Sequence, residues 1–135
     1  MSEPEAASEY LVISRGKWDA GVSAEVIQAA IDEFYVWLDG LVARGKMRPG
    51  QRLANSGRTV SRRPTVTDGP YGEAKEVIGG YWFILAHSLE EAAEIAAGNP
   101  CMRLGLFYEV RPIDPDRCSA STVSAETPEE GAARG

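Results

Sequence analysis

The sequence predicts an α+β fold in which two helices pack against one sheet. Short apolar runs at residues 10–13, 80–85 and 106–111 are typical of strands. Between them, segments with the helical spacing of apolar residues follow Ser23 and Ser88. The resulting order is strand, helix, strands, strand, helix, strand, which favours a two-layer sandwich.

The first strand and helix have clear boundaries. Residues 10–13 form an apolar run that is too short for a helix and is followed by Arg15 and Gly16. We expect Ser23 to cap the first helix and Gly45 to end it, because serine accepts from free amides and glycine tolerates a left-handed exit.

The middle of the chain contains the central strand. Residues 51–67 are rich in Arg, Ser and Thr, which indicates one or two exposed strands. Residues 80–85 are apolar at every position, as in a strand that is covered on both faces.

The last helix and strand follow directly. Ser88 and Glu91 have the spacing of a capping box, and Gly98 and Pro100 should stop the helix that they open. Residues 106–111 then predict the final strand.

The strands at residues 11–13 and 81–84 are apolar on both alternating faces. If both helices lie on one face, the other face needs a cover, and a second copy of the chain is the simplest one. The alternative is that these side chains pack under the exposed segment 51–67. We expect a homodimer.

Charge divides the 135 residues into three parts. Residues 1–8 carry two acids and no base, and residues 114–135 carry five acids and two bases, although the whole chain has a net charge of −6. Residues 9–113 are nearly neutral, with thirteen acids and twelve bases. We therefore expect one domain at 9–113 between a flexible N-terminus and a disordered acidic tail.

Neither a signal peptide nor a membrane span is visible, so a cytoplasmic protein is expected. The two cysteines, Cys101 and Cys118, read as free thiols rather than a disulfide. The sequence has no phosphate-binding glycine loop, no paired cysteines with zinc spacing and no histidine pair, so we expect neither cofactor nor metal.

The segment 67–76 is the sharpest local motif. Asp68, Gly69 and Pro70 form an ordinary tight turn in the structural interpretation. In the functional interpretation, Asp68 points into a cleft as a proton acceptor or ligand anchor.

Asp68-Gly69-Pro70-Tyr71, with Glu73, Lys75-Glu76 and Gly79-Gly80-Tyr81, resembles the signature of the YCII-related family in its DGPF form, with Tyr71 in place of the usual Phe. Three further stretches resemble the same family: Arg15-Gly16 with Trp18, residues 45–53 and residues 109–112.

The resemblance implies a ferredoxin-like sandwich that pairs into a dimeric α/β barrel. It also implies a functional link to extracytoplasmic-function sigma factors, and for Asp68 the role of the acid in a suspected His-Asp pair. His87, the only histidine, precedes a helix cap and is expected at the surface, which leaves Asp68, Glu73 or Glu109 as candidate bases.

Residues 40–67 contain seven bases and no acid. This segment, which includes Arg62, can attract an anionic small molecule or an acidic surface, or it can solvate an exposed hairpin and protect its edge. Nucleic acid is disfavoured because no aromatic residue lies between Leu38 and Pro70.

Two functions remain open from the sequence. The first is a small-molecule-binding or regulatory accessory module. The second is a cofactor-free enzyme, of isomerase, lyase or monooxygenase-like type, with Asp68 as general base and Arg15 stabilising an oxyanion. Trp18 either lines the pocket or packs on the surface. The candidate ligand-binding residues are Arg15, Trp18, Arg62, Asp68, Gly69, Pro70 and Tyr71.

Overall fold

The computed structural model describes residues 7–60, 62, 67–69 and 77–128, without the side chains of 67–69. The helices and strands of this part, in chain order, are β1 (Ser8–Arg15), α1 (Ala24–Ala43), β2 (Met47–Arg48), β3 (Gly57–Thr59), β4 (Thr67–Gly69), β5 (Ile78–Ala86), α2 (Leu89–Ala96), the 3₁₀ helix η2 (Pro100–Leu104) and β6 (Phe107–Pro112).

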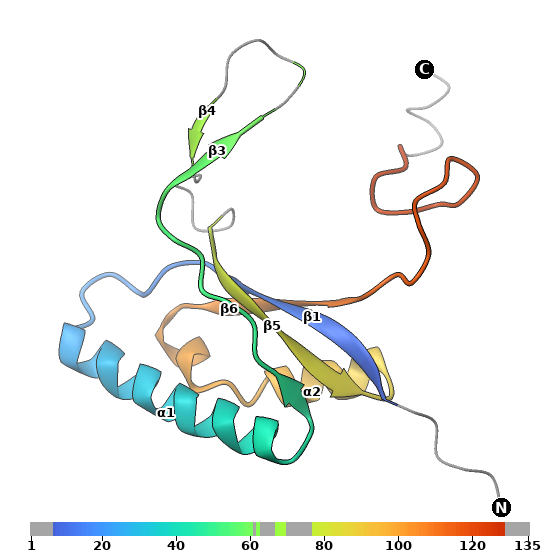
Figure 1. Cartoon of the computed structure of the whole chain (residues 1–135). Helices are drawn as coiled ribbons and strands as arrows, with labels where there is room; N and C mark the ends of the chain where they lie inside the picture. Colours follow the sequence, from blue (N-terminus) through green and yellow to red (C-terminus); the bar gives the residue numbers. More distant parts are fainter. Residues whose placement is uncertain (1–6, 61, 63–66, 70–76, 129–135) are drawn as a thin grey trace, which may run out of the picture.

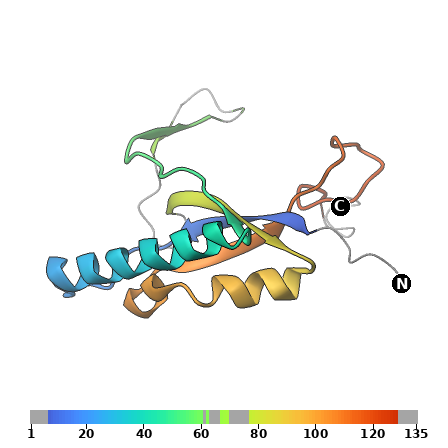
Figure 2. The same cartoon turned by 60° about the horizontal axis from the view of Figure 1, so that its bottom comes forward.

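The main sheet has the strand order β2-β5-β1-β6, and every neighbouring pair is antiparallel. Both α-helices lie on one face of this sheet (Figures 1 and 2). The fold is therefore α+β, as predicted, and its strand order is compatible with a ferredoxin-like sandwich. Strands β3 and β4 pair with each other in a separate two-stranded sheet.

The core lies between the main sheet and the helices. Val12 stands between Trp82 and Val110 in the register, and Val12 and Ile84 are fully buried. Along β1 and β5, buried residues alternate with half-buried ones, so only the face under the helices is sealed.

Helix α1 begins and ends where the sequence predicts. The Ser23 Oγ accepts from the Val26 amide at 3.2 Å. At the other end Gly45 has φ +72°, and the Lys46 amide donates to the Leu41 carbonyl at 2.9 Å, which satisfies the last turn.

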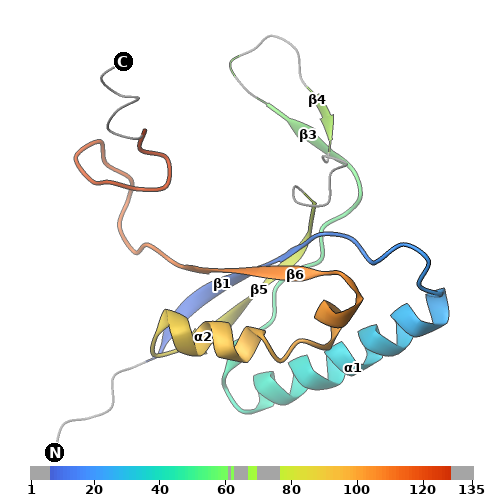
Figure 3. The same cartoon turned by 180° about the vertical axis from the view of Figure 1, so that it is seen from behind.

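Helix α2 is also capped as predicted, with the Glu91 amide donating to Ser88 Oγ at 3.1 Å. The 3₁₀ helix η2 was not predicted. It forms because Asn99 Oδ1 accepts from the Cys101 amide at 2.9 Å and Pro100 supplies a preset φ at the first position. Figure 3 shows η2 beside α1.

The segment after β6 leaves the sheet at its edge (Figure 3), and its described side chains, from residue 113 to 128, are exposed. Among the described residues, no helix is long and apolar enough to cross a membrane.

Candidate functional site

A cavity of about 140 Å³ lies between α1 and the main sheet. We call it the α1 cavity. Its described lining comes from β1, the loop after it, α1, the segment after β2, β5, η2 and β6, and consists of Ser14, Trp18, Ile31, Phe34, Tyr35, Arg52, Trp82, Cys101, Leu106 and Tyr108.

Aromatic rings make up much of the wall. The Trp82 ring lies 5.4 Å from that of Phe34 on one side and 5.4 Å from that of Tyr108 on the other. Tyr35 continues the series, with its ring 5.1 Å from Phe34. These separations are typical of favourable aromatic pairs, so the wall is preformed.

Polar groups gather at one end of the cavity. Ser14 and Tyr108 stand directly opposite each other on β1 and β6. Ser14 is 3% exposed, and the η2 residue Cys101 is equally buried. The Cys101 thiol donates to the Ala30 carbonyl of α1 at 3.8 Å, which ties η2 to that helix.

Burial raises the pKa of Tyr108 well above its usual range, and the nearby Cys101 raises it further. Burial also raises the pKa of the Cys101 thiol. Both groups are therefore protonated at neutral pH, so the phenol is a hydrogen-bond donor and the thiol is a poor nucleophile.

Two buried donors have no hydrogen-bond partner among the described residues. They are Nε1 of Trp82, in the cavity wall, and Nδ2 of Asn99, next to Cys101. An unmade hydrogen bond at a buried donor costs about 1–3 kcal/mol, so these two nitrogens reduce the stability of this part of the core.

Arg52 is the only charged residue of the described lining. The residues on either side of it bind to β5: the Tyr81 amide donates to the Gln51 carbonyl at 3.0 Å, and the Leu53 amide to the Gly79 carbonyl at 2.9 Å. These bonds hold the Arg52 backbone beside β5 while its exposed side chain reaches the cavity.

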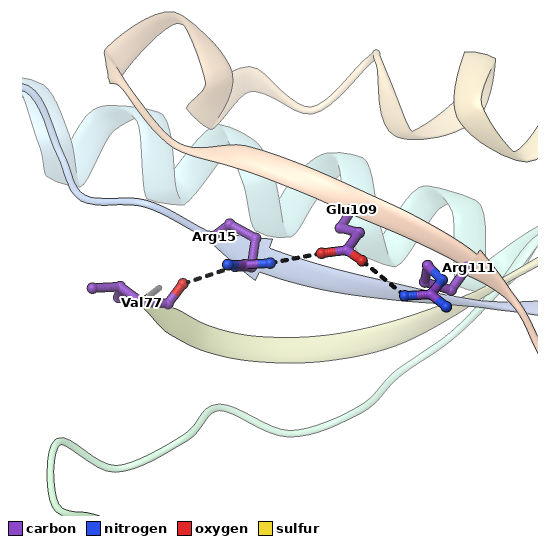
Figure 4. A network of polar contacts seen from close by, with 4 residues as sticks. All are labelled: Arg15, Val77, Glu109 and Arg111. Carbon is purple, nitrogen blue, oxygen red and sulfur yellow. Dashed lines mark hydrogen bonds and ion pairs between the residues drawn. The ribbon is translucent and has the colours of Figure 1, made fainter. Parts of the chain in front are cut away.

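Arg15 belongs to a different surface (Figure 4). Its guanidinium donates to Glu109 Oε1 at 2.6 Å and to the Val77 carbonyl at 3.3 Å, and Glu109 Oε2 accepts from Arg111 at 3.1 Å. Arg15 and Glu109 alternate with the inward-facing Ser14 and Tyr108, so they lie on the face away from the helices. The described cavity is thus built without Arg15.

The remaining predicted site residues divide into three groups. Trp18 lines the α1 cavity. Asp68 and Gly69 have their backbone in β4, opposite Arg58 and Gly57, and Arg62 is exposed. The Asp68 side chain, Glu73, Pro70 and Tyr71 lie outside the described residues. His87 is exposed, as predicted.

The residues that sequence reasoning missed are Ser14, Arg52, Trp82, Cys101 and Tyr108. One signal was available for Ser14, because the alternation Tyr10, Val12, Ser14 places a hydroxyl on the buried face of β1. Arg52 could not be singled out from the other bases of its segment, since its place in the cavity follows from contacts with β5.

No group of three or more His, Cys, Asp or Glu side chains in the described ranges could hold a metal ion. What the lining offers is hydroxyl, indole and guanidinium donors beside aromatic rings. That combination is suited to binding a small organic molecule that carries an acceptor group.

Fold and site define the class: an α+β domain with a small aromatic-walled cavity between its long helix and a four-stranded antiparallel sheet. Residues 9–115 match the family model of the YCII-related domain. The chain belongs to this family. No curated protein matches the chain.

Proposed function

We propose that the protein is a small-molecule-binding module, with a regulatory or accessory role, that holds its ligand in the α1 cavity. The observation that carries the proposal is the cavity itself, where aromatic rings lie beside the polar groups of Ser14, Arg52 and Tyr108. Small-molecule sites usually combine a mostly apolar lining with a few placed polar groups.

The proposal includes a homodimer formed through the open face of the main sheet. Leu11, Ile13, Tyr81 and Phe83 are only partly buried there, and no described helix covers them. These apolar side chains are flanked by two groups of ion pairs. One joins Glu109 to Arg15 and Arg111, and the other joins Arg48 to Glu9. An apolar centre with a charged rim is the usual anatomy of an interface.

Filling the cavity tests the binding function. Ile31 lines the cavity from α1, so Ile31→Phe should occupy part of its volume. We expect a thermal-shift screen of small metabolites to find compounds that raise the Tm of the wild-type protein and lose that effect in Ile31→Phe. Val36→Phe, on the exposed side of the same helix, is the matched control and should respond like wild type.

A screen in which every stabilising compound acts equally on wild type and Ile31→Phe would contradict the proposed site. Proper folding of the variant is checked by circular dichroism, which should be unchanged.

We further propose that the chain is of the DGPF form of the family, because of its motif at residues 68–71, and the resemblance to that form implies a link to a sigma factor. A cytoplasmic location is proposed as well. The enzyme alternative, with Asp68 as base, stays a prediction, and the described lining of the α1 cavity contains no carboxylate.

A further inference from the structure

The charge balance of the α1 cavity is one-sided. Arg52 is its only charged described residue, and the adjoining smaller hollow, which shares Phe34, Tyr35, Arg52 and Trp82, adds no other charged residue among those described. Arg52 makes no hydrogen bond or ion pair with any residue in the part of the chain that the structure describes. A cation at a cavity without a counter-charge favours an anionic ligand.

The guanidinium group of Arg52 lies at the polar end of the cavity, near Ser14. Its two terminal nitrogens lie 3.6 and 3.7 Å from the point where a Cβ on Gly79 would stand, and Ser14 Oγ lies 3.6 Å from the same point. The guanidinium and the Ser14 hydroxyl therefore lie on the same side of β5, close to Gly79. Guanidinium and hydroxyl can then bind the oxygens of one carboxylate.

The cavity has the size of one ring. An engineered cavity of about 150 Å³ is large enough to bind benzene, and the α1 cavity measures about 140 Å³. Its wall is formed by the rings of Phe34, Trp82 and Tyr108, which suits a flat apolar body. The protonated Tyr108 hydroxyl is a further donor near it.

We infer that the ligand is a planar, ring-sized carboxylate whose ring lies against the aromatic wall and whose carboxylate binds Arg52 next to Ser14. This inference rests on the proposed function, because it names the chemical class of molecule that the α1 cavity takes. It assigns Arg52 as the residue that decides between anionic and neutral ligands.

Benzoate and benzamide are the probes, because they share ring and shape and differ in charge. Binding is measured by calorimetric titration and by tryptophan fluorescence, to which Trp18 and Trp82 report from the cavity wall. We expect benzoate to bind wild type at least about tenfold more tightly than benzamide, since a charge-assisted pair replaces a neutral contact. Acetate, which lacks the ring, should bind more weakly than benzoate.

Arg52→Gln removes the charge and keeps most of the side-chain length. We expect it to weaken benzoate binding about tenfold and to leave benzamide binding unchanged. Arg44→Gln makes the same change at an exposed arginine outside the cavity lining and should leave both affinities unchanged. Raising the salt concentration should weaken benzoate binding only in proteins that keep Arg52.

Three results would overturn the inference: no benzoate binding by the folded protein, equal affinity for benzoate and benzamide, or unchanged benzoate binding in Arg52→Gln. If acetate binds as tightly as benzoate, the inference that the ligand contains a ring is refuted. The proposed function fails separately, when stabilising compounds of any charge are insensitive to Ile31→Phe. If neutral ligands lose their binding in Ile31→Phe but keep it in Arg52→Gln, the proposed binding site is supported and the inference that its ligand is an anion is refuted.

Discussion

Tyr108 shows how one side chain serves both the stability and the chemistry of the cavity. Its ring packs on Trp82, while its hydroxyl lies near Ser14 and Cys101, away from most of the solvent. Burial disfavours the phenolate, so the folded protein holds the phenolic proton at pH values where the unfolded chain has lost it.

This raised pKa predicts a loss of stability at alkaline pH. Above the ordinary tyrosine pKa of 10.0, the unfolded state binds fewer protons than the folded state, so the free energy of unfolding falls as pH rises. Below that pH, the contribution of the Tyr108 phenol to the free energy of unfolding is fully present. We expect Tyr108→Phe to cost about 1 kcal/mol at pH 7, from the lost hydroxyl, and to show a shallower decline above pH 10.

Urea unfolding at pH 7 and at about pH 10.5 measures both effects. Tyr35→Phe removes a hydroxyl from a tyrosine that is 45% exposed and is the matched control. A decline of equal steepness in wild type and Tyr108→Phe would contradict the account.

At the scale of elements, the approach of residues 50–53 to β5 decides whether Arg52 reaches the cavity. Gly50 and Gly80 make this approach possible, because a Cβ on either would meet backbone atoms of the facing segment. For Gly80 the nearest atoms are the Gln51 carbonyl oxygen at 2.8 Å and the Arg52 Cα at 3.2 Å.

Gly80→Ala should therefore push the segment 50–53 away from β5. We expect a loss of about 1–3 kcal/mol in the free energy of unfolding, as for other overpacked sites, together with weaker binding of any ligand that needs Arg52. The measurements are chemical denaturation and calorimetric titration.

Gly79→Ala is the matched control on the same strand. A Cβ there makes only ordinary contacts, at 3.6 Å from Arg52 and Ser14, so we expect a change within about 0.5 kcal/mol. Equal destabilisation by both variants would refute the claim that the close approach at Gly80 is specific.

At the scale of the whole molecule, the two faces of the main sheet differ in what covers them. One face packs on the helices and encloses the α1 cavity. The other presents Leu11, Ile13, Tyr81 and Phe83, with Arg48 stacked at 4.0 Å over the Phe83 ring. Exposed apolar patches of this kind mark interaction surfaces.

We expect the wild-type protein to have the mass of two chains in size-exclusion chromatography with light scattering. Ile13→Glu should convert it to a folded monomer, because the new carboxylate would be removed from water next to Glu109 in the dimer. Val36→Glu, at a position 75% exposed on α1, should stay dimeric. A monomeric wild type, or a dimeric Ile13→Glu, would exclude this face as the interface.

Local features of the fold could be predicted because they depend on neighbouring residues. Ser23, Gly45 and Ser88 mark helix ends by chemistry that acts within one turn, and the structure confirms each of them. The η2 helix escaped prediction because it depends on one Asn side chain capping a single turn, which no periodicity marks.

The candidate site could be predicted only in part. Trp18 lines the α1 cavity, whereas Arg15 is paired with Glu109 on the other face of the sheet. Sequence reasoning could not pair Arg15 with Glu109, because the two residues are 94 positions apart and meet only through the β1–β6 register.

The sequence by itself determined the α+β class, the main strands and the helix ends, because periodicity and capping act over a few residues. Only the tertiary structure decided which polar groups share a cavity. Ser14, Arg52, Cys101 and Tyr108 come from four separate segments, and the register of the sheet and the packing of η2 on α1 bring them together. Such long-range pairing depends on the packing of the whole core, which no local pattern encodes.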